Sequence, residues 1–205
     1  MSRALLYVVD PMCSWCWGFA PVIAELQAAL APGVGLRYVM GGLAPDSAAP
    51  MDAATRAYVQ DAWRAVAART GAAFNHEFWT RCAPRRSTYP ACRAMLLARA
   101  AGKEGALLTA IQHAYYRDAR NPSDAEVLAD LAAGLGMDRA AFLRGLGDPR
   151  TQAVLEADFA LRDRMGARGY PSLGVETGGQ AALLSSGWKD AATLRPLLAA
   201  AGLLA

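Results

Sequence analysis

The sequence predicts an α/β fold in which a small sheet is interrupted, after its second strand, by a large all-helical insertion. Short apolar runs of strand length lie near both ends of the 205-residue chain. Between about residues 52 and 166, by contrast, no run has the composition of a strand. The length allows one α/β domain with an insertion, or two small domains that share a core. We expect residues 1–45 and 166–205 to form the sheet domain, and residues 46–165 to form an inserted helical domain.

The N-terminal segment predicts a strand, a helix and a second strand. Ala4–Val9 is rich in β-branched and apolar residues, which favours a buried strand. A helix should follow, because apolar side chains recur at helical spacing before Pro32-Gly33 ends the pattern; they are Val22, Ile23, Leu26 and Leu30. Leu36–Met40 is the second predicted strand. It should run parallel to the first, since a helix connects them.

The middle of the chain predicts a series of helices broken by glycine, proline and polar residues. Their approximate ranges are 52 to 70, 88 to 101, 104 to 118, 123 to 134, 138 to 145 and 149 to 165. Asp138 is a predicted N-cap, and Ser123 with Glu126 three residues later has the pattern of a capping box. The last of these helices should return the chain to the sheet.

The C-terminal segment completes the predicted sheet. Ser172–Glu176 and Ala181–Ser185 are strand-like runs joined by Gly178-Gly179, the composition of a hairpin turn. A closing helix is predicted over Thr193–Ala201.

Charge and hydropathy exclude two classes of partner. The net charge is +3, from 21 basic and 18 acidic residues, and the only short basic cluster spans Arg81 to Arg86. This distribution does not support nucleic-acid binding. No stretch approaches the apolar length of a membrane span, and Ala4–Val9 is too short for a signal-peptide core. We therefore expect a cytoplasmic protein, in which a transient catalytic disulfide is favoured over a structural one.

A Cys-x-x-Cys motif, Cys13-Ser14-Trp15-Cys16, lies between the first strand and the first helix. A helix that begins at Cys13 offers unpaired N–H groups and a partial positive charge to its sulfur, which favours the thiolate. Cys16 follows one turn later, close enough to form a disulfide. We expect Cys13 to attack and Cys16 to resolve. Trp15 should be exposed beside the sulfur, where it can bind substrate, although packing beneath the helical insertion is the alternative.

The motif and its surroundings resemble the DsbA-like branch of the thioredoxin superfamily. Strand, Cys-x-x-Cys and helix form the opening of thioredoxins, and Pro21 matches their helix-kinking proline. Gly169-Tyr170-Pro171 looks like their cis-proline loop, followed by a strand. The resemblance implies a thioredoxin-like fold and a thiol-disulfide oxidoreductase or isomerase. It also implies that Pro171 packs against the disulfide while the peptide at Tyr170 binds extended substrate.

Two positions depart from that family. Many DsbA proteins have histidine where this chain has Trp15, so we expect a less oxidising site. Thioredoxins and DsbA place a buried acid where this chain has Tyr7, and the nearest acid is Asp10. Asp10 and Ser14 are the residues expected to tune the cysteines, and sequence alone leaves the proton acceptor for Cys16 open.

Alternatives remain open for the other cysteines. Cys82 and Cys92 could complete a zinc site with the motif, but their spacing of ten residues disfavours it, so we expect no metal and no cofactor. Cys92 could face the active site, although such a cysteine is more often a small buried apolar residue.

Other functions are also compatible with the sequence. Kappa-class glutathione transferases and hydroxychromene carboxylate isomerases resemble this architecture, but they lack the resolving cysteine that Cys16 supplies. A redox-sensitive adaptor is the third alternative. The predicted substrates of the leading function are protein or small-molecule disulfides, with glutathione or thioredoxin as redox partner.

Overall fold

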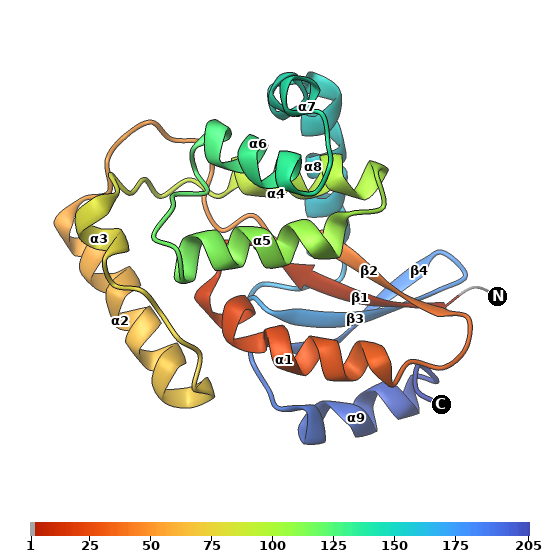
Figure 1. Cartoon of the computed structure of the whole chain (residues 1–205). Helices are drawn as coiled ribbons and strands as arrows, with labels where there is room; N and C mark the ends of the chain where they lie inside the picture. The colour runs from red at the N-terminus through yellow and green to blue at the C-terminus, as the bar shows by residue number, and fades with distance from the viewer. Residues whose placement is uncertain (1–2) are drawn as a thin grey trace.

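The fold is built on a four-stranded mixed sheet, seen in a computed structural model that describes residues 3–205 (Figure 1). The strands are β1 (Arg3–Val9), β2 (Val34–Met40), β3 (Ser172–Thr177) and β4 (Gln180–Ser186), in the order β2-β1-β3-β4. β1 pairs in parallel with β2, as predicted, with Tyr7 opposite Tyr38. β3 runs antiparallel to β1, and the predicted hairpin joins it to β4.

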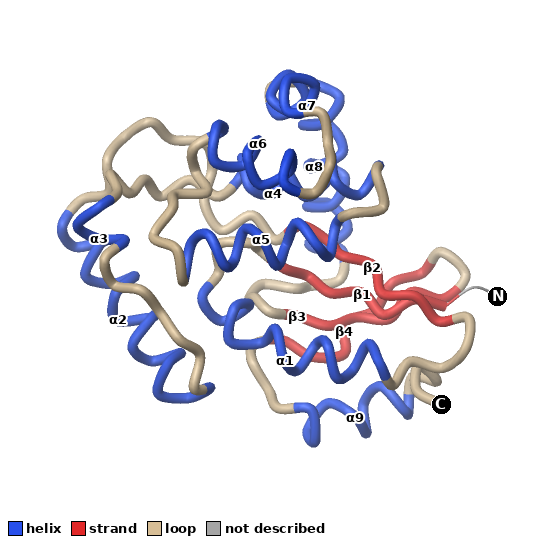
Figure 2. The backbone as a smooth tube through the Cα atoms, in the orientation of Figure 1, coloured by secondary structure: helices blue, strands red, loops and turns tan. Residues whose placement is uncertain are grey.

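The helices occupy the positions that the sequence periodicity predicts. They are α1 (Ser14–Ala28), α2 (Ala53–Thr70), α3 (Phe78–Arg81), α4 (Tyr89–Ala100), α5 (Glu104–Tyr116), α6 (Ala125–Gly134), α7 (Arg139–Leu146), α8 (Pro149–Arg164) and α9 (Ala191–Ala200). Only the short α3 was not predicted. The α/β class, with its helical block between β2 and β3, is confirmed. Figure 2 shows the strands side by side, with α1 and α9 together along one side of them.

Both faces of the sheet are covered, which explains why the buried stretch of β1 is apolar apart from the Tyr7 hydroxyl. Successive side chains of a strand point to opposite faces. Tyr7 lies on the face that packs against α1 and α9, in the same core as Phe19 and Leu194. Val8 lies on the other face and packs in a second cluster with Leu161 of α8. Both faces of β1 are therefore apolar, as the continuous run predicted.

One of the two predicted N-caps is confirmed and the other is wrong. The Asp138 carboxylate accepts from the Ala141 N–H at the start of α7. Ser123 does not cap α6, whose N-cap is Asp124. The Ser123 hydroxyl instead donates to the Ser87 carbonyl at 2.7 Å, a contact between distant segments that a local pattern does not reveal.

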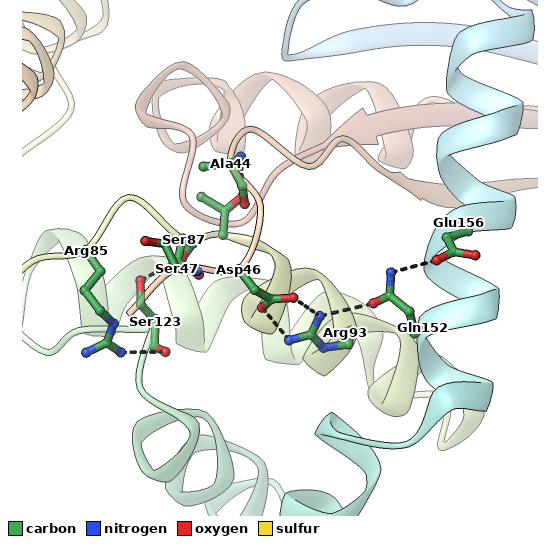
Figure 3. Close-up of polar contacts among 10 residues, drawn as sticks. Ala44, Asp46, Ser47, Arg85, Ser87, Arg93, Ser123, Gln152 and Glu156 are labelled. Atoms are coloured by element: carbon green, nitrogen blue, oxygen red, sulfur yellow. Dashed lines mark hydrogen bonds and ion pairs between the residues drawn. The ribbon is translucent and has the colours of Figure 1, made fainter. Parts of the chain in front are cut away.

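Polar contacts fasten the loop that follows β2 to the helical block (Figure 3). The Ser47 N–H donates to the Ser87 hydroxyl at 3.2 Å. Asp46 receives a bidentate ion pair from Arg93 of α4, at 2.7 and 2.8 Å, and Arg93 also donates to Gln152 of α8. Bidentate charged pairs of this kind fix geometry as well as adding energy. The loop between β2 and α2 is therefore held against α4 and α8.

Within residues 3–205, no helix combines the length and the apolar character that crossing a membrane requires.

Candidate active site

Cys13 caps the N-terminus of α1, directly after the loop that leaves β1. Its backbone is extended (φ −82°, ψ 119°), and its carbonyl accepts the Trp17 N–H at 3.0 Å. The first turn of α1 holds no acidic side chain, and the helix N-terminus carries a partial positive charge. The Cys13 residue as a whole is 6% exposed. Reactive cysteines are found at helix N-termini, which is where Cys13 lies.

Cys16 lies one turn further along α1 and is fully buried, with 0% exposure. Both cysteines are free thiols in this structure. Burial raises the pKa of Cys16 well above its usual value, and the neighbouring Cys13 adds to this effect. The two cysteines therefore differ: Cys13 lies at the helix terminus, whereas Cys16 is fully buried and its raised pKa keeps it protonated.

A cleft of about 180 Å³ opens above Cys13. Its walls come from the active-site segment, from α2, from the loop before α4 and from the loop before β3; they include Ser14, Trp15, Tyr58, Arg86, Arg168 and Tyr170. A volume of this size holds a few side-chain-sized groups and is smaller than a drug-sized ligand pocket. The cleft therefore suits a segment of an extended or small flexible ligand.

The structure brings most of the predicted site residues together. Trp15 is half-buried, lines the cleft and packs against the main core, so it is less exposed than predicted. Ser14 also lines the cleft. The Tyr170–Pro171 peptide bond is cis, and Pro171 is buried outside the lining.

Tyr170 presents its backbone, and not its hydroxyl, to the sulfur. Its carbonyl accepts from the Cys13 thiol at 3.7 Å. Its hydroxyl donates to the Gly41 carbonyl at 2.7 Å and accepts from Arg162 at 3.3 Å. Gly41 is required for this arrangement, because a Cβ there would lie 2.8 Å from the Tyr170 ring. The side chain anchors the loop, so the carbonyl stays beside Cys13.

Asp10 supports the site from beneath and does not line the cleft. Its carboxylate accepts from the Met12 N–H at 2.8 Å, the Leu43 N–H at 2.7 Å and the Thr88 hydroxyl at 2.6 Å. Burial raises the pKa of Asp10, against the lowering effect of these hydrogen bonds. Asp10 thus joins the active-site loop, the segment after β2 and the start of α4.

The remaining cysteines lie away from the cleft lining. Cys92 is fully buried, and its thiol lies 3.8 Å from an Asp10 carboxylate oxygen. Burial, followed by the charge of Asp10, raises the pKa of Cys92 well above its usual value. The Cys82 thiol donates to the Ala119 carbonyl at 3.1 Å. Among residues 3–205, no group of three or more His, Cys, Asp or Glu side chains is arranged to hold a metal ion.

Sequence reasoning did not predict the basic residues of the cleft. Arg86 and Arg168 both line it, and the Arg86 guanidinium lies 5.8 Å from the ring centroid of Tyr58. One feature of the sequence could have indicated Arg86, because this residue ends the only short basic cluster of the sequence. Arg168 lies two residues before Tyr170, in the same loop. These cations give the cleft above Cys13 a positive character.

Comparison with known proteins places these features in a family. A family model described as a DsbA-like thioredoxin domain matches residues 4–199. A proposed protein disulfide isomerase from Nitrosomonas europaea is 29% identical with a TM-score of 0.87, over 98% of this chain and 97% of that one. The cytosolic disulfide reductase DsbM from Pseudomonas aeruginosa is 28% identical with a TM-score of 0.75, over 89% of each chain. A second DsbM structure contains glutathione.

A curated relative is more distant. The ClpXP adapter protein SpxH from Bacillus subtilis (strain 168) is 25% identical over 169 residues, which cover 80% of this chain. The match spans about 55% of the length of that relative. A 2-hydroxychromene-2-carboxylate isomerase is 15% identical with a TM-score of 0.62, a likeness of fold alone.

Proposed function

This chain belongs to the family of DsbA-like thioredoxin domains, and we propose that it exchanges thiols and disulfides through Cys13 and Cys16. The observation that carries the proposal is the position of the Cys13 sulfur, at a helix N-terminus and on the floor of a cleft. A thiolate so placed is the reactive form in disulfide exchange.

The exchange proceeds in two displacements. The Cys13 thiolate attacks one sulfur of a substrate disulfide, forms a Cys13–substrate mixed disulfide and releases the other substrate sulfur as a thiolate. Cys16 then loses its proton and attacks the Cys13 sulfur, which releases the second substrate thiolate and leaves a Cys13–Cys16 disulfide. The substrate gains two electrons and the protein loses two. Glutathione or thioredoxin thiols reverse these steps and regenerate the dithiol.

Trp15 and Tyr170 are proposed to bind the substrate. The Trp15 ring forms part of the cleft wall, and backbone groups at Tyr170 can pair with an extended peptide, a mode that tolerates many sequences. Pro171 keeps that backbone beside the sulfur, while Asp10 and Ser14 shape the loop around Cys13.

Glutathione, free or attached to a protein, is the substrate class that the cleft chemistry favours. It carries two carboxylates on a short flexible peptide, and Arg86 and Arg168 offer two cations beside Cys13. The glutathione-containing DsbM structure, 27% identical to this chain, supports the same class. DsbM is a cytosolic disulfide reductase, which also supports a reducing compartment for this protein.

A trapping experiment tests the proposed exchange. Cys16→Ser, incubated with oxidised glutathione, should gain one glutathione at Cys13, measured by intact mass and peptide mapping. The wild type should form an internal disulfide instead, and Cys13→Ser should gain no glutathione in the motif. Failure of Cys16→Ser to trap glutathione at Cys13 would contradict the proposed chemistry.

The two arginines are tested with a charged and a neutral substrate. Arg86→Gln and Arg168→Gln should raise the KM for oxidised glutathione without raising that for hydroxyethyl disulfide, which carries no charge. Arg195→Gln is the matched control, because Arg195 pairs with Glu25 on the surface and does not line the cleft. Equal changes for the two substrates would contradict recognition of carboxylates.

An adaptor remains the second candidate function, and the match to SpxH is the observation that favours it. Capture from a lysate with Cys16→Ser separates the two functions. Many mixed-disulfide clients indicate an oxidoreductase, whereas one dominant partner indicates an adaptor with a redox switch.

A further inference from the structure

The Tyr170 hydroxyl and Arg162 of α8 share one acceptor, the carbonyl of Gly41 directly after β2. The hydroxyl donates to this carbonyl at 2.7 Å, and the Arg162 guanidinium donates to the same oxygen and, at 3.3 Å, to the Tyr170 hydroxyl. A carbonyl oxygen has two lone pairs, so both acceptor positions are occupied. Because Arg162 donates to the hydroxyl oxygen, the hydroxyl hydrogen is left for Gly41. We call Gly41, Arg162 and Tyr170 the Gly41 latch.

The Gly41 latch completes a series of hydrogen bonds around the start of the active-site loop. The Gly41 N–H donates to the Val9 carbonyl of β1 at 2.7 Å. At the other end of the series, the Tyr170 carbonyl accepts from the Cys13 thiol at 3.7 Å. Val9 and Cys13 begin and end one short segment, so the series sets the distance between this segment and the Tyr170 backbone. Arg162 is the member that the helical block contributes.

The surroundings of Arg162 fix the direction of its guanidinium. The guanidinium lies 4.6 Å from the ring centroid of Phe159 and donates to the Asp163 carboxylate at 2.8 Å. Phe159 packs against Gly42 so closely that a Cβ on Gly42 would overlap the ring. The Arg162 side chain is only 17% exposed. A largely buried cation is therefore directed at the Gly41 carbonyl, where a charge-assisted hydrogen bond is stronger than a neutral one.

The attachment of α8 to the sheet does not depend on Arg162. The Asp158 carboxylate accepts from the Met40 N–H of β2 at 3.0 Å and from Arg99 of α4 at 2.9 Å. Leu161 is buried in the cluster that includes Val8 of β1. These contacts hold α8 against the sheet, whereas Arg162 reaches the loop before β3. Its contribution is therefore to the position of that loop.

We propose that Arg162 is a positioning residue for the exchange at Cys13 and that it acts through Tyr170. This inference rests on the proposed exchange at Cys13 and Cys16. In the dithiol, the Tyr170 carbonyl accepts from the Cys13 thiol. After the Cys13 sulfur has lost its proton to solvent and bonded to a substrate sulfur, this carbonyl has no donor on Cys13 and accepts from a backbone N–H of the substrate. Arg162 keeps the carbonyl where that N–H can reach it.

The Gly41 latch therefore favours disulfides that carry a peptide N–H near the sulfur. A disulfide without an amide reacts at the same Cys13 sulfur but gains no hydrogen bond from the Tyr170 carbonyl. This preference is separate from the recognition of carboxylates by Arg86 and Arg168, because an uncharged peptide disulfide also gains the hydrogen bond.

Two uncharged disulfides test the positioning role. N,N′-diacetylcystine bis(methylamide) carries backbone N–H groups, whereas hydroxyethyl disulfide carries none. Reduced protein is mixed with each, quenched in acid and analysed by mass, which gives the rate at which the dithiol is lost. Arg162→Gln should react about fivefold more slowly with the peptide disulfide, the effect of one hydrogen bond, and within about twofold of the wild type with hydroxyethyl disulfide. A loss below about twofold for the peptide disulfide, or an equal loss for both, would overturn the positioning role.

Arg162→Lys and Arg164→Gln are the matched variants. Lysine keeps a cation that can donate to the Gly41 carbonyl, so Arg162→Lys should react faster with the peptide disulfide than Arg162→Gln does. Arg164 is exposed two residues further along α8, and Arg164→Gln makes the same change of charge, so both of its rates should stay within about twofold of the wild type. No recovery by lysine, or the same selective loss in Arg164→Gln, would contradict the proposal.

A double variant tests whether the two side chains act together. Tyr170→Phe keeps the ring beside Gly41 and removes only the hydroxyl, so it should give a selective loss of similar size. Because one latch carries both effects, Arg162→Gln combined with Tyr170→Phe should lose no more than about twofold beyond the slower single variant. Losses that multiply would overturn the shared latch.

The same data distinguish failure of the inference from failure of the proposed function. If the wild type loses its dithiol to neither disulfide, the proposed exchange is wrong and the inference falls with it. If the wild type reacts with both disulfides and Arg162→Gln keeps the wild-type ratio of the two rates, only the positioning role is overturned.

Discussion

Replacing Asp10 with asparagine should loosen the support of the active-site loop. One carboxylate oxygen accepts from the Met12 N–H at 2.8 Å, and the other accepts from the Leu43 N–H at 2.7 Å and the Thr88 hydroxyl at 2.6 Å. Asparagine keeps the shape of the side chain but has only one acceptor oxygen. Whichever way the amide turns, its NH₂ group faces at least one buried donor.

The magnitude follows from the better of the two amide orientations. With the oxygen toward Leu43 and Thr88, the Met12 N–H loses its acceptor and meets another donor. A buried donor left without its partner costs about 1–3 kcal/mol. For a chain of this length, that loss corresponds to a fall of about 2–12 °C in melting temperature. The opposite orientation would leave two donors unpaired and cost more.

Urea unfolding measures the free-energy change, and amide hydrogen exchange locates it. Exchange at Met12 and Leu43 should accelerate in Asp10→Asn, because both N–H groups depend on this carboxylate. Asp61→Asn is the control, since Asp61 forms an exposed ion pair with Arg64 in which such a change costs about 0–1 kcal/mol. If Asp10→Asn is no more destabilising than Asp61→Asn, and exchange at Met12 and Leu43 is unchanged, the supporting role of Asp10 is refuted.

Three further predictions concern reactivity, potential and pH. Cys13 should react fastest with iodoacetamide at neutral pH. It should react ahead of the more exposed Cys82, because burial and Asp124 raise the pKa of Cys82. Faster labelling of Cys16 or Cys92 would contradict the assignment. Trp15→His should make the Cys13/Cys16 couple more oxidising by roughly 30–65 mV, from one charge-assisted contact to the thiolate, and a shift below about 10 mV would show that Trp15 only packs. The Asp148 carboxylate accepts hydrogen bonds from the Arg150 side chain and N–H, which lower its pKa from 3.8 to about 2. The ionised carboxylate therefore stabilises the folded protein above the unfolded-state pKa, and this stabilisation is lost as the pH falls through about 2. Asp148→Asn should therefore destabilise the protein at pH 6, with a difference that shrinks between pH 4 and pH 2 in urea titrations.

Local patterns were enough to predict the strands and helices that the structure describes, apart from the short α3, and the proximity of the two motif cysteines. Ala4–Val9 gave a continuous apolar run because both faces of β1 are covered, and the hairpin followed from two adjacent glycines. Cys13, Cys16 and Trp15 share one short segment, so their proximity follows from chain continuity. The prediction for Ser123 failed because its hydroxyl donates to the distant Ser87 carbonyl, and the N-cap of α6 is the next residue, Asp124.

The parts of the site that sequence did not reveal depend on how helices pack. Tyr58 reaches the cleft only because α2 packs beside α1, and Arg86 lies there only because its loop is folded back toward the motif. Gln112 and Cys16 line one cavity of about 250 Å³ because α5 lies opposite α1. None of these contacts has a short-range signature, since each joins residues more than forty positions apart in the chain.

The most direct test of the central claim is equilibration of the protein with glutathione redox buffers, followed by mass spectrometry of the acid-quenched protein. The account predicts a cooperative two-electron transition between the dithiol and a Cys13–Cys16 disulfide. Because Trp15 supplies no charge to the thiolate, the midpoint should lie well below the roughly −120 mV of DsbA. In the same buffers, Cys16→Ser should form glutathionylated Cys13 and no internal disulfide. Absence of an internal disulfide across the whole range of buffers would contradict the assignment of Cys13 and Cys16 as a redox couple.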